Sequence, residues 1–232
     1  MSSVRWLHDL AHLFYPRLCL ACKGTLPLVE EQICLKCQYQ MPKTGQYALL
    51  ENAFTEIFWG RVRMETGAAM YYFSKSGRVQ KLIHQLKYSN QPEIGRQLGV
   101  LYGQLLATQP HYTAVDAIVP VPLHPRKQHL RGYNQAAMFG KGLSESMQRP
   151  LFSHALYRPI FTDTQTRKSR QERLENAMRS FDVQQPDLLR GKHILLVDDV
   201  LTTGATLEAC ASCVLELPGT RVSMATIAMA GD

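Results

Sequence analysis

The chain has 232 residues, with 26 Lys and Arg against 19 Asp and Glu, so its formal net charge at pH 7 is +7. Apolar residues make up 45% and charged residues 19%, a composition that excludes a disordered or fibrous chain and allows a sizeable core. The length suits one main domain with a small accessory module. The excess of basic over acidic residues favours polyanionic partners, namely phosphorylated small molecules, nucleic acid or an anionic membrane surface.

The sequence has no segment with the features of a membrane span. No stretch reaches the ~18 consecutive apolar residues of a spanning helix, and charged residues interrupt the first twenty residues, where a secretory signal would need an apolar core. We therefore expect a cytoplasmic protein. A short amphipathic helix is predicted near the N-terminus, docked on the protein itself because its polar face has few Lys or Arg for membrane binding. Its apolar residues are Trp6, Leu7, Leu10, Leu13 and Phe14.

Four cysteines near the N-terminus form two Cys-x-x-Cys pairs separated by eleven residues. This spacing predicts a closed tetrahedral zinc site that stabilises a small zinc-ribbon module rather than performing catalysis. The module and its connector are expected over residues 1–62, and the main domain over 63–232. Two disulfides or loose redox thiols are the alternative, which a reducing compartment disfavours. The predicted zinc ligands are Cys19, Cys22, Cys34 and Cys37.

A second Cys-x-x-Cys pair, Cys210 and Cys213, lies within an expected helix. Residues three apart on a helix share a face, where small apolar thiols commonly pack, so we interpret this pair as structural. The connector before residue 64 contains an apolar cluster without a clear period, which we expect to pack the zinc module onto the main domain. The cluster consists of Phe54, Ile57, Phe58 and Trp59.

From residue 67 onward the sequence predicts alternating strands and helices. Alternation of this kind is typical of an α/β fold with a doubly wound parallel sheet, in which ligands bind beyond the carboxyl ends of the strands. Strands are predicted over 68–73, 116–122, 151–156, 193–197 and 221–228. Helices are predicted around 79–86 and 94–105 and over 133–147 and 205–217.

The most informative segment follows the predicted strand at 193–197. Asp198 and Asp199 come directly after the strand, and a Thr-Thr-Gly sequence then starts a helix. Gly204 permits a tight turn whose amides converge on a phosphate at the positive end of that helix. The two acids suit ribose hydroxyls and a magnesium ion, often bound through water. The ligand-binding residues predicted here are Val200, Leu201, Thr202, Thr203, Gly204, Ala205 and Thr206.

This run resembles the phosphoribosyl diphosphate signature of type I phosphoribosyltransferases, which is an apolar strand, paired acids, two residues and Thr-Thr-Gly-x-Thr. The resemblance implies 5-phosphoribosyl diphosphate or a similar ligand, with Mg²⁺ as cofactor and Asp198 and Asp199 as catalytic residues. It also implies attack on the anomeric carbon of the ribose as diphosphate leaves, so catalysis would rest on neutralising the leaving group and positioning the attacker.

Two basic segments are candidates for neutralising that diphosphate. The first is a loop expected after the middle strand, and it supplies Arg126, Arg131 and Gly132, supported by Asn134. The second resembles the mobile loop that closes over the diphosphate in such folds. A merely solvated charged surface is the alternative for both segments. Lys87 also could reach the site, although favourable charge at a helix C-terminus explains it equally well. The residues of the second segment are Arg167, Lys168 and Arg170.

Three features together resemble the ComF family of competence-associated, phosphoribosyltransferase-like bacterial proteins. They are the four-cysteine segment, Pro-Val-Pro-Leu with Arg-Gly-Tyr-Asn-Gln in the middle, and Asp-Asp-Val-x-Thr-Thr-Gly-Ala-Thr near the end. The resemblance implies a role in the uptake of transforming DNA on the cytoplasmic side. The implied partners are single-stranded DNA, a DNA-translocating helicase and other uptake proteins.

Three functions are consistent with these residues, and the fold alone does not choose among them. The leading interpretation is a competence role with retained binding of the sugar diphosphate. The second is a working phosphoribosyltransferase that joins ribose 5-phosphate to a base or another nucleophile. The third is a regulator that senses the ligand without consuming it.

Overall fold

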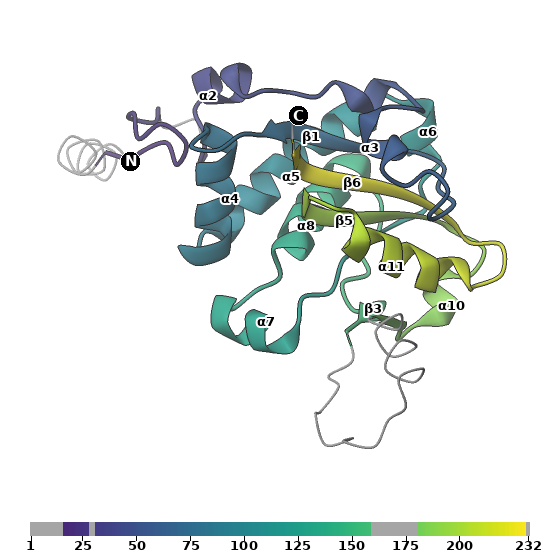
Figure 1. Ribbon diagram of the computed structural model, residues 1–232. Helices are drawn as coiled ribbons and strands as arrows, with labels where there is room; N and C mark the ends of the chain where they lie inside the picture. The colour runs from purple at the N-terminus through teal and green to yellow at the C-terminus, as the bar shows by residue number, and fades with distance from the viewer. Residues whose placement is uncertain (1–15, 28–30, 159–180, 231–232) are drawn as a thin grey trace, which may run out of the picture.

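The computed structural model describes residues 16–27, 31–158 and 181–230, and a four-stranded parallel sheet lies at its centre (Figure 1). The strands pair in the order β1-β6-β5-β2. The two central strands are rich in Ile, Leu, Val, Met and Ala and are almost fully buried, as expected for a parallel sheet covered on both faces. The bounds are Gly67–Phe73 for β1, Ala117–Pro120 for β2, His193–Leu201 for β5 and Arg221–Ala230 for β6.

Helices cover both faces of the sheet, which confirms the predicted doubly wound α/β architecture. The buried residues of α4, α5 and α8 join one apolar cluster, and those of α11 join a second cluster. Figure 1 shows α11 in front of β5 and β6, with α5 and α8 behind them. The sequence predicted all four helices, and the apolar periodicity of α4 and α5 indicated those two. Their bounds are Arg78–Tyr88 for α4, Pro92–Leu106 for α5, Gln135–Met147 for α8 and Ala205–Leu215 for α11.

The remaining helices in the described part of the chain are short. They provide connections around the sheet, and no helix among the described residues is long and apolar enough to cross a membrane. Their bounds are Leu35–Gln40 for α2, Gln46–Ala48 for η1, Ala53–Glu56 for α3, Pro110–Thr113 for α6, Pro125–Arg131 for α7 and Pro186–Leu189 for α10.

Glycines allow α5 and α8 to pack with their backbones in contact. A Cβ on Gly142 would lie 2.0 Å from the carbonyl oxygen of Arg96, and a Cβ on Gly99 would lie 2.2 Å from that of Phe139. Both distances are far below van der Waals contact, so no larger residue fits without moving a helix. This contact fixes α8, whose first turn lies near the carboxyl end of β2.

The four-cysteine segment packs against α4 and α5. The buried Cys19 and Ile33 belong to the same apolar cluster as these two helices. Two glutamines add hydrogen bonds: Gln85 Nε2 donates to the carbonyl of Leu20 at 2.5 Å, and Gln97 Oε1 accepts from the amide of Gln32 at 3.0 Å. The amphipathic helix predicted around Trp6–Phe14 lies outside the described residues. The division of the chain at residues 62 and 63 stays a prediction.

Two local predictions were wrong. The strand expected over 151–156 is reduced to one bridge, Ile118 with Leu151, because the chain turns over the next residues and Ala155 N donates to the carbonyl of Phe152. Beyond this turn, a short antiparallel hairpin of β3 (Leu156–Tyr157) and β4 (Asp182–Val183) forms instead. The basic segment after β2, expected as a loop, contains the helix α7, which starts with Pro125 and is capped after Arg131 by Gly132 in the left-handed conformation, φ 77°.

The connector also differs from expectation. Phe54 and Phe58 are fully buried, but they belong to the apolar cluster of β6 and α11, on the opposite face of the sheet from the cysteines. Trp59 is 61% exposed. The aromatic cluster therefore does not join the cysteine segment to the main domain, and it packs below the β5–α11 loop instead.

Candidate functional site

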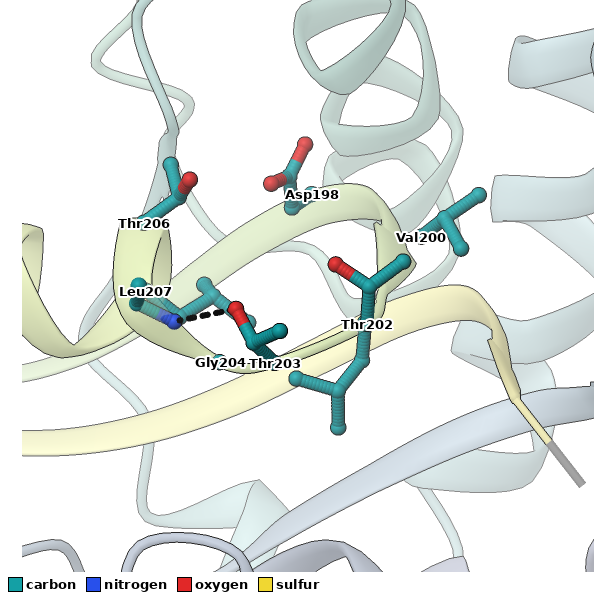
Figure 2. A pocket seen from close by; sticks show the side chains of 9 residues that line it. Asp198, Val200, Thr202, Thr203, Gly204, Thr206 and Leu207 are labelled. Carbon is teal, nitrogen blue, oxygen red and sulfur yellow. Dashed lines mark hydrogen bonds between the residues drawn. The ribbon is translucent and has the colours of Figure 1, made fainter. Parts of the chain in front are cut away.

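The β5–α11 loop forms a small hollow at the carboxyl end of β5 (Figure 2). The turn depends on Gly204, whose φ of 79° lies in the left-handed region that favours glycine. Ala205 N donates to Thr203 Oγ1 at 3.5 Å, the dashed contact in Figure 2. In the described structure the hydroxyls of Thr202 and Thr206 have no hydrogen-bond partner. The hollow is lined by Asp198, Val200, Leu201, Thr202, Thr203, Gly204, Ala205, Thr206 and Leu207.

This arrangement suits a phosphate group. The first amides of α11 have no carbonyl partner one turn earlier, and the helix dipole adds positive potential at the same end. Free threonine hydroxyls offer further donors beside these amides. The side chain of Asp198 also lies at this hollow in Figure 2, so an acid and the phosphate donors share one site.

Asp198 and Asp199 make different contacts although they are adjacent. Burial, followed by the neighbouring carboxylate of Asp199, raises the pKa of Asp198 to about 7. Asp199 Oδ1 forms an ion pair with Lys87 Nζ at 3.0 Å, and the two side chains are only 13% and 22% exposed. Lys87 lies in the last turn of α4. The structure thus brings Lys87 to the acid pair, which the sequence left undecided.

The acid pair has the chemistry of a magnesium site. Mg²⁺ prefers oxygen ligands and usually keeps several waters, so one or two carboxylates with ligand phosphates are enough to hold it. Asp198 Oδ1 accepts a hydrogen bond from the amide of Asp199 at 2.7 Å. A bound cation would relieve the repulsion between the carboxylates of Asp198 and Asp199. These residues fit Mg²⁺, which stays a prediction.

Residues from the connector support the loop from below, and sequence reasoning missed them. A Cβ on Gly204 would lie 3.0 Å from Phe58 Cε1 and 3.1 Å from Ile57 Cγ2, so the turn packs directly on the residues that follow α3. Arg61 Nη1 donates to the carbonyl of Thr203 at 3.0 Å, and the same guanidinium pairs with Glu208 on α11. The only available signal was an aromatic cluster without periodicity, which did not indicate a partner.

The four N-terminal cysteines converge as predicted. Their sulfur atoms all lie within 4.8 Å of one another. A tetrahedral zinc site with Zn–S bonds of about 2.3 Å needs sulfurs about 3.8 Å apart, and Cys22 Sγ and Cys34 Sγ are 3.8 Å apart. The cluster therefore fits a metal such as zinc, and the identity of the metal stays a prediction.

The thiols of this cluster differ in acidity. Burial raises the pKa of Cys19, but hydrogen bonds from neighbouring amides, among them Cys34 N at 3.3 Å, outweigh burial and lower it to about 7. Burial and the adjacent sulfurs of Cys22 and Cys34 raise the pKa of Cys37 well above its usual value. The Cys19 thiolate forms readily, whereas the raised pKa values of Cys34 and Cys37 mean that these two thiols need a cation to ionise beside it.

The second cysteine pair has a structural environment. Cys210 is fully buried on α11, and burial raises its pKa well above the ordinary value. Burial also raises the pKa of the half-buried Cys213, to about 11. Among the described residues, the metal-binding geometry is confined to the N-terminal cluster. These observations agree with the interpretation of this pair as packing residues.

Comparisons with known proteins identify the family. The family model of the phosphoribosyl transferase domain matches residues 135–231. The chain is 38% identical over 207 residues to Competence protein ComFC of Bacillus subtilis, covering 86% of this chain and 78% of that protein. The chain belongs to the ComF family.

Two further relatives support the ComF assignment. DNA utilization protein YhgH of Salmonella typhi is 33% identical over 216 residues, covering 88% of this chain and 92% of that protein. Competence protein F of Haemophilus influenzae is 28% identical over 207 residues, covering 84% and 89%. Among solved structures, the glutamine phosphoribosylpyrophosphate amidotransferase of B. subtilis aligns with 17% identity and a TM-score of 0.45, over 62% of this chain and 30% of that one.

The predicted ligands of the first basic segment in this ComF protein lie outside the loop hollow. Arg126 is exposed on α7, and Gly132 ends that helix. Arg131 donates to Gln135 Oε1 at 2.7 Å and lies 5.3 Å above the ring of Tyr88. Asn134 caps α8, because its Oδ1 accepts from Ala136 N at 3.0 Å, so a structural role explains it. The predicted residues Arg167, Lys168 and Arg170 lie outside the described residues.

Replacing one cysteine of the N-terminal cluster tests the metal site. We predict that Cys34→Ser loses bound zinc and unfolds the cysteine segment, because three thiolates no longer close a tetrahedral site. Metal content per chain and thermal melting measure the two effects. The matched control is Cys213→Ser on α11, which should keep its zinc. Full zinc content and unchanged melting of Cys34→Ser would contradict the assignment.

The acidity of Asp198 predicts a pH-dependent stability. Its pKa is about 7 in the folded protein and about 4 in an unfolded chain. The folded state then holds a proton that the unfolded state releases, so Asp198 lowers stability progressively as pH rises from about 4 to 7. Without ligand or Mg²⁺, Asp198→Asn should therefore melt above the wild type at pH 8, and this difference should shrink toward pH 5.

The control for this experiment is Asp187→Asn, whose side chain is 90% exposed and which should change melting little. A wild type that melts above Asp198→Asn at pH 8 would mean that Asp198 stabilises the fold rather than costing stability.

Proposed function

We propose that this ComF protein binds 5-phosphoribosyl diphosphate with Mg²⁺ at the β5–α11 loop and serves the uptake or utilization of DNA. The observation that carries the ligand proposal is the juxtaposition of two features at one strand end. Open amides and hydroxyls suited to a phosphate lie beside two carboxylates suited to ribose hydroxyls and a metal ion.

Each part of the ligand has a candidate partner in this site. The 5′-phosphate would bind the amides and hydroxyls of residues 202–206, which are neutral donors at a helix N-terminus. Asp198 and Asp199 would accept from the ribose hydroxyls and hold Mg²⁺. Lys87 Nζ orients the Asp199 carboxylate through their 3.0 Å contact. A bound Mg²⁺ would supply the positive charge that offsets the departing diphosphate.

The DNA role rests on the relatives and on charge. Two relatives are named competence proteins, and a third is named a DNA utilization protein. The net charge of +7 favours a polyanion. We propose single-stranded DNA as the polymer, and a DNA-translocating helicase and other competence proteins as partners, in the cytoplasm.

A working phosphoribosyltransferase is the second candidate. Its supporting observation is that both acids are present and that a lysine contacts one of them, which are the groups such a reaction requires. Release of diphosphate in the presence of a base would support this candidate, whereas binding without turnover supports a ligand-binding uptake protein.

Thermal melting with ligand tests the proposed function. We predict that 5-phosphoribosyl diphosphate with Mg²⁺ raises the melting temperature of the wild type, since a ligand at about 100 times its Kd adds about 2.7 kcal/mol to the free energy of unfolding. The double variant Asp198→Asn, Asp199→Asn should show no such shift. Thr206→Val, which removes one hydroxyl from the phosphate loop, should shift less than the wild type.

The matched control replaces two exposed acids away from the loop, Glu51→Gln with Asp187→Asn, and should shift as the wild type does. An equal shift in the Asp198 and Asp199 variant would place the ligand elsewhere. Absence of a shift in the wild type would make the fold a scaffold without this ligand.

A further inference from the structure

A second, larger pocket lies beside the phosphate loop, between α7, α8 and the β3–β4 hairpin. Its volume is about 570 Å³, within the range of small-molecule sites. Figure 1 shows both α7 and β3 below β5. Its walls are largely apolar and include Pro122, Leu123, Met138 and Leu156.

The strand register places this pocket next to the phosphate loop. Pro120 of β2 pairs with Val197 of β5, and Val121 N donates to the carbonyl of Val197 at 2.9 Å. Pro122 lines the large pocket, and Asp198 lines the loop hollow. Pro122 is two residues after Pro120, and Asp198 is one residue after its partner Val197. Neighbouring strands are about 4.8 Å apart. The two hollows therefore both lie at the carboxyl ends of neighbouring strands, β2 and β5.

The polar groups of the pocket suit a neutral heteroaromatic ring. The side chains of Gln128, Ser153, His154 and Gln184 line it, and none has a hydrogen-bond partner within the described residues. Amide, hydroxyl and imidazole groups both donate and accept, as the edge of a nucleobase requires. Of the described residues that line it, only Arg158 carries a formal charge when histidine is neutral.

Two tyrosines offer flat surfaces whose hydroxyls are already bonded. Tyr133 and Tyr157 both line the pocket. Tyr133 Oη donates to the carbonyl of Leu86 at 2.5 Å, and Tyr157 Oη donates to Asp182 Oδ2 at 2.9 Å. Hydrogen bonds at their far ends restrain both rings, so stacking a base on either ring costs little further side-chain entropy.

The helix at the rim of the pocket carries unpaired positive charge. α7 has no buried residue and no acid, and its Pro125 and Gln128 line the pocket. Arg126 and Lys127, between them in sequence, are exposed and form no ion pair within the described part of the chain. A basic helix beside an aromatic pocket whose described lining has no acid is a combination that suits single-stranded nucleic acid, with phosphates outside and a base inside.

We propose that this pocket binds a base of single-stranded DNA, with α7 holding the adjacent phosphates through Arg126 and Lys127. The inference rests on the proposed function, because it gives a site to the proposed DNA binding. It is independent of the sugar diphosphate, since none of the residues that line the large pocket lines the loop hollow.

Two strands of equal length test the role of the base. Labelled oligothymidine and an abasic strand carry the same phosphates, and fluorescence anisotropy measures the affinity of each. The abasic strand should bind about 5- to 150-fold more weakly, the range expected from base–aromatic stacking. Equal affinities would overturn the inference.

Two kinds of variant separate the base from the phosphates. Ala137→Phe, which fills the pocket, and His154→Ala, which removes an exposed polar group without filling it, should reduce the preference for the base-bearing strand and leave the abasic affinity within about twofold. Arg126→Gln with Lys127→Gln should weaken both strands and reduce the salt slope of log K by about 1.4. Lys36→Gln with Arg63→Gln removes the same charge elsewhere and should leave base preference and affinity near the wild type.

The remaining outcomes distinguish a base of DNA from a free nucleoside, and the pocket proposal from the sugar diphosphate proposal. Equal weakening of both strands by the pocket variants would overturn the inference. It would also be overturned if a free nucleoside bound the pocket while the DNA strand bound the wild type and the pocket variants with equal affinity. The pocket variants should keep the thermal shift with 5-phosphoribosyl diphosphate and Mg²⁺. Loss of that shift in the wild type, with base preference retained, would refute the sugar diphosphate and leave the pocket assignment supported.

Discussion

Two carboxylates lie side by side where β5 leaves the buried core, and their repulsion sets what the site can bind. Burial and Asp199 raise the pKa of Asp198, while Lys87 at 3.0 Å holds Asp199. Lys87 lies on α4, the helix that follows β1, and it supplies a positive charge to the acids at the end of β5. One lysine offsets only part of the charge of two ionised acids. A bound cation and the hydroxyls of a ribose would complete the balance, which is why a metal-dependent sugar phosphate is the ligand class that we propose.

The loop next to these acids is held from two sides. Above it, α11 supplies the amides that face the hollow, and below it Phe58 packs on Gly204 while Arg61 bonds the carbonyl of Thr203. Preorganised donors bind an anion without first rearranging, so this support would add to the affinity for the proposed phosphate. The connector thus contributes to the geometry of the main domain, and the cysteine segment packs on the opposite face against α4 and α5.

Local patterns predicted those parts of the protein whose physics is local. The strand before Asp198, the glycine turn at Gly204 and the convergence of four cysteines each follow from residue type and spacing. Contacts between distant segments had no such signal. Lys87 could be assigned to Asp199 only when α4 and β5 were placed together, and Arg61 lies in a segment without periodicity. The structure shows Asn134 capping α8, a role that was not predicted from the sequence, and its support of ligand binding stays a prediction.

The central claim is that the β5–α11 loop binds the phosphate of a sugar phosphate beside the two acids. The most direct measurement is a diffraction structure of the chain crystallised with ribose 5-phosphate and Mg²⁺. The account predicts phosphate oxygens within hydrogen-bond distance of the amides of residues 202–206 and ribose hydroxyls facing Asp198 and Asp199. Clear density for the ligand at another site, with this loop free of phosphate, would contradict it.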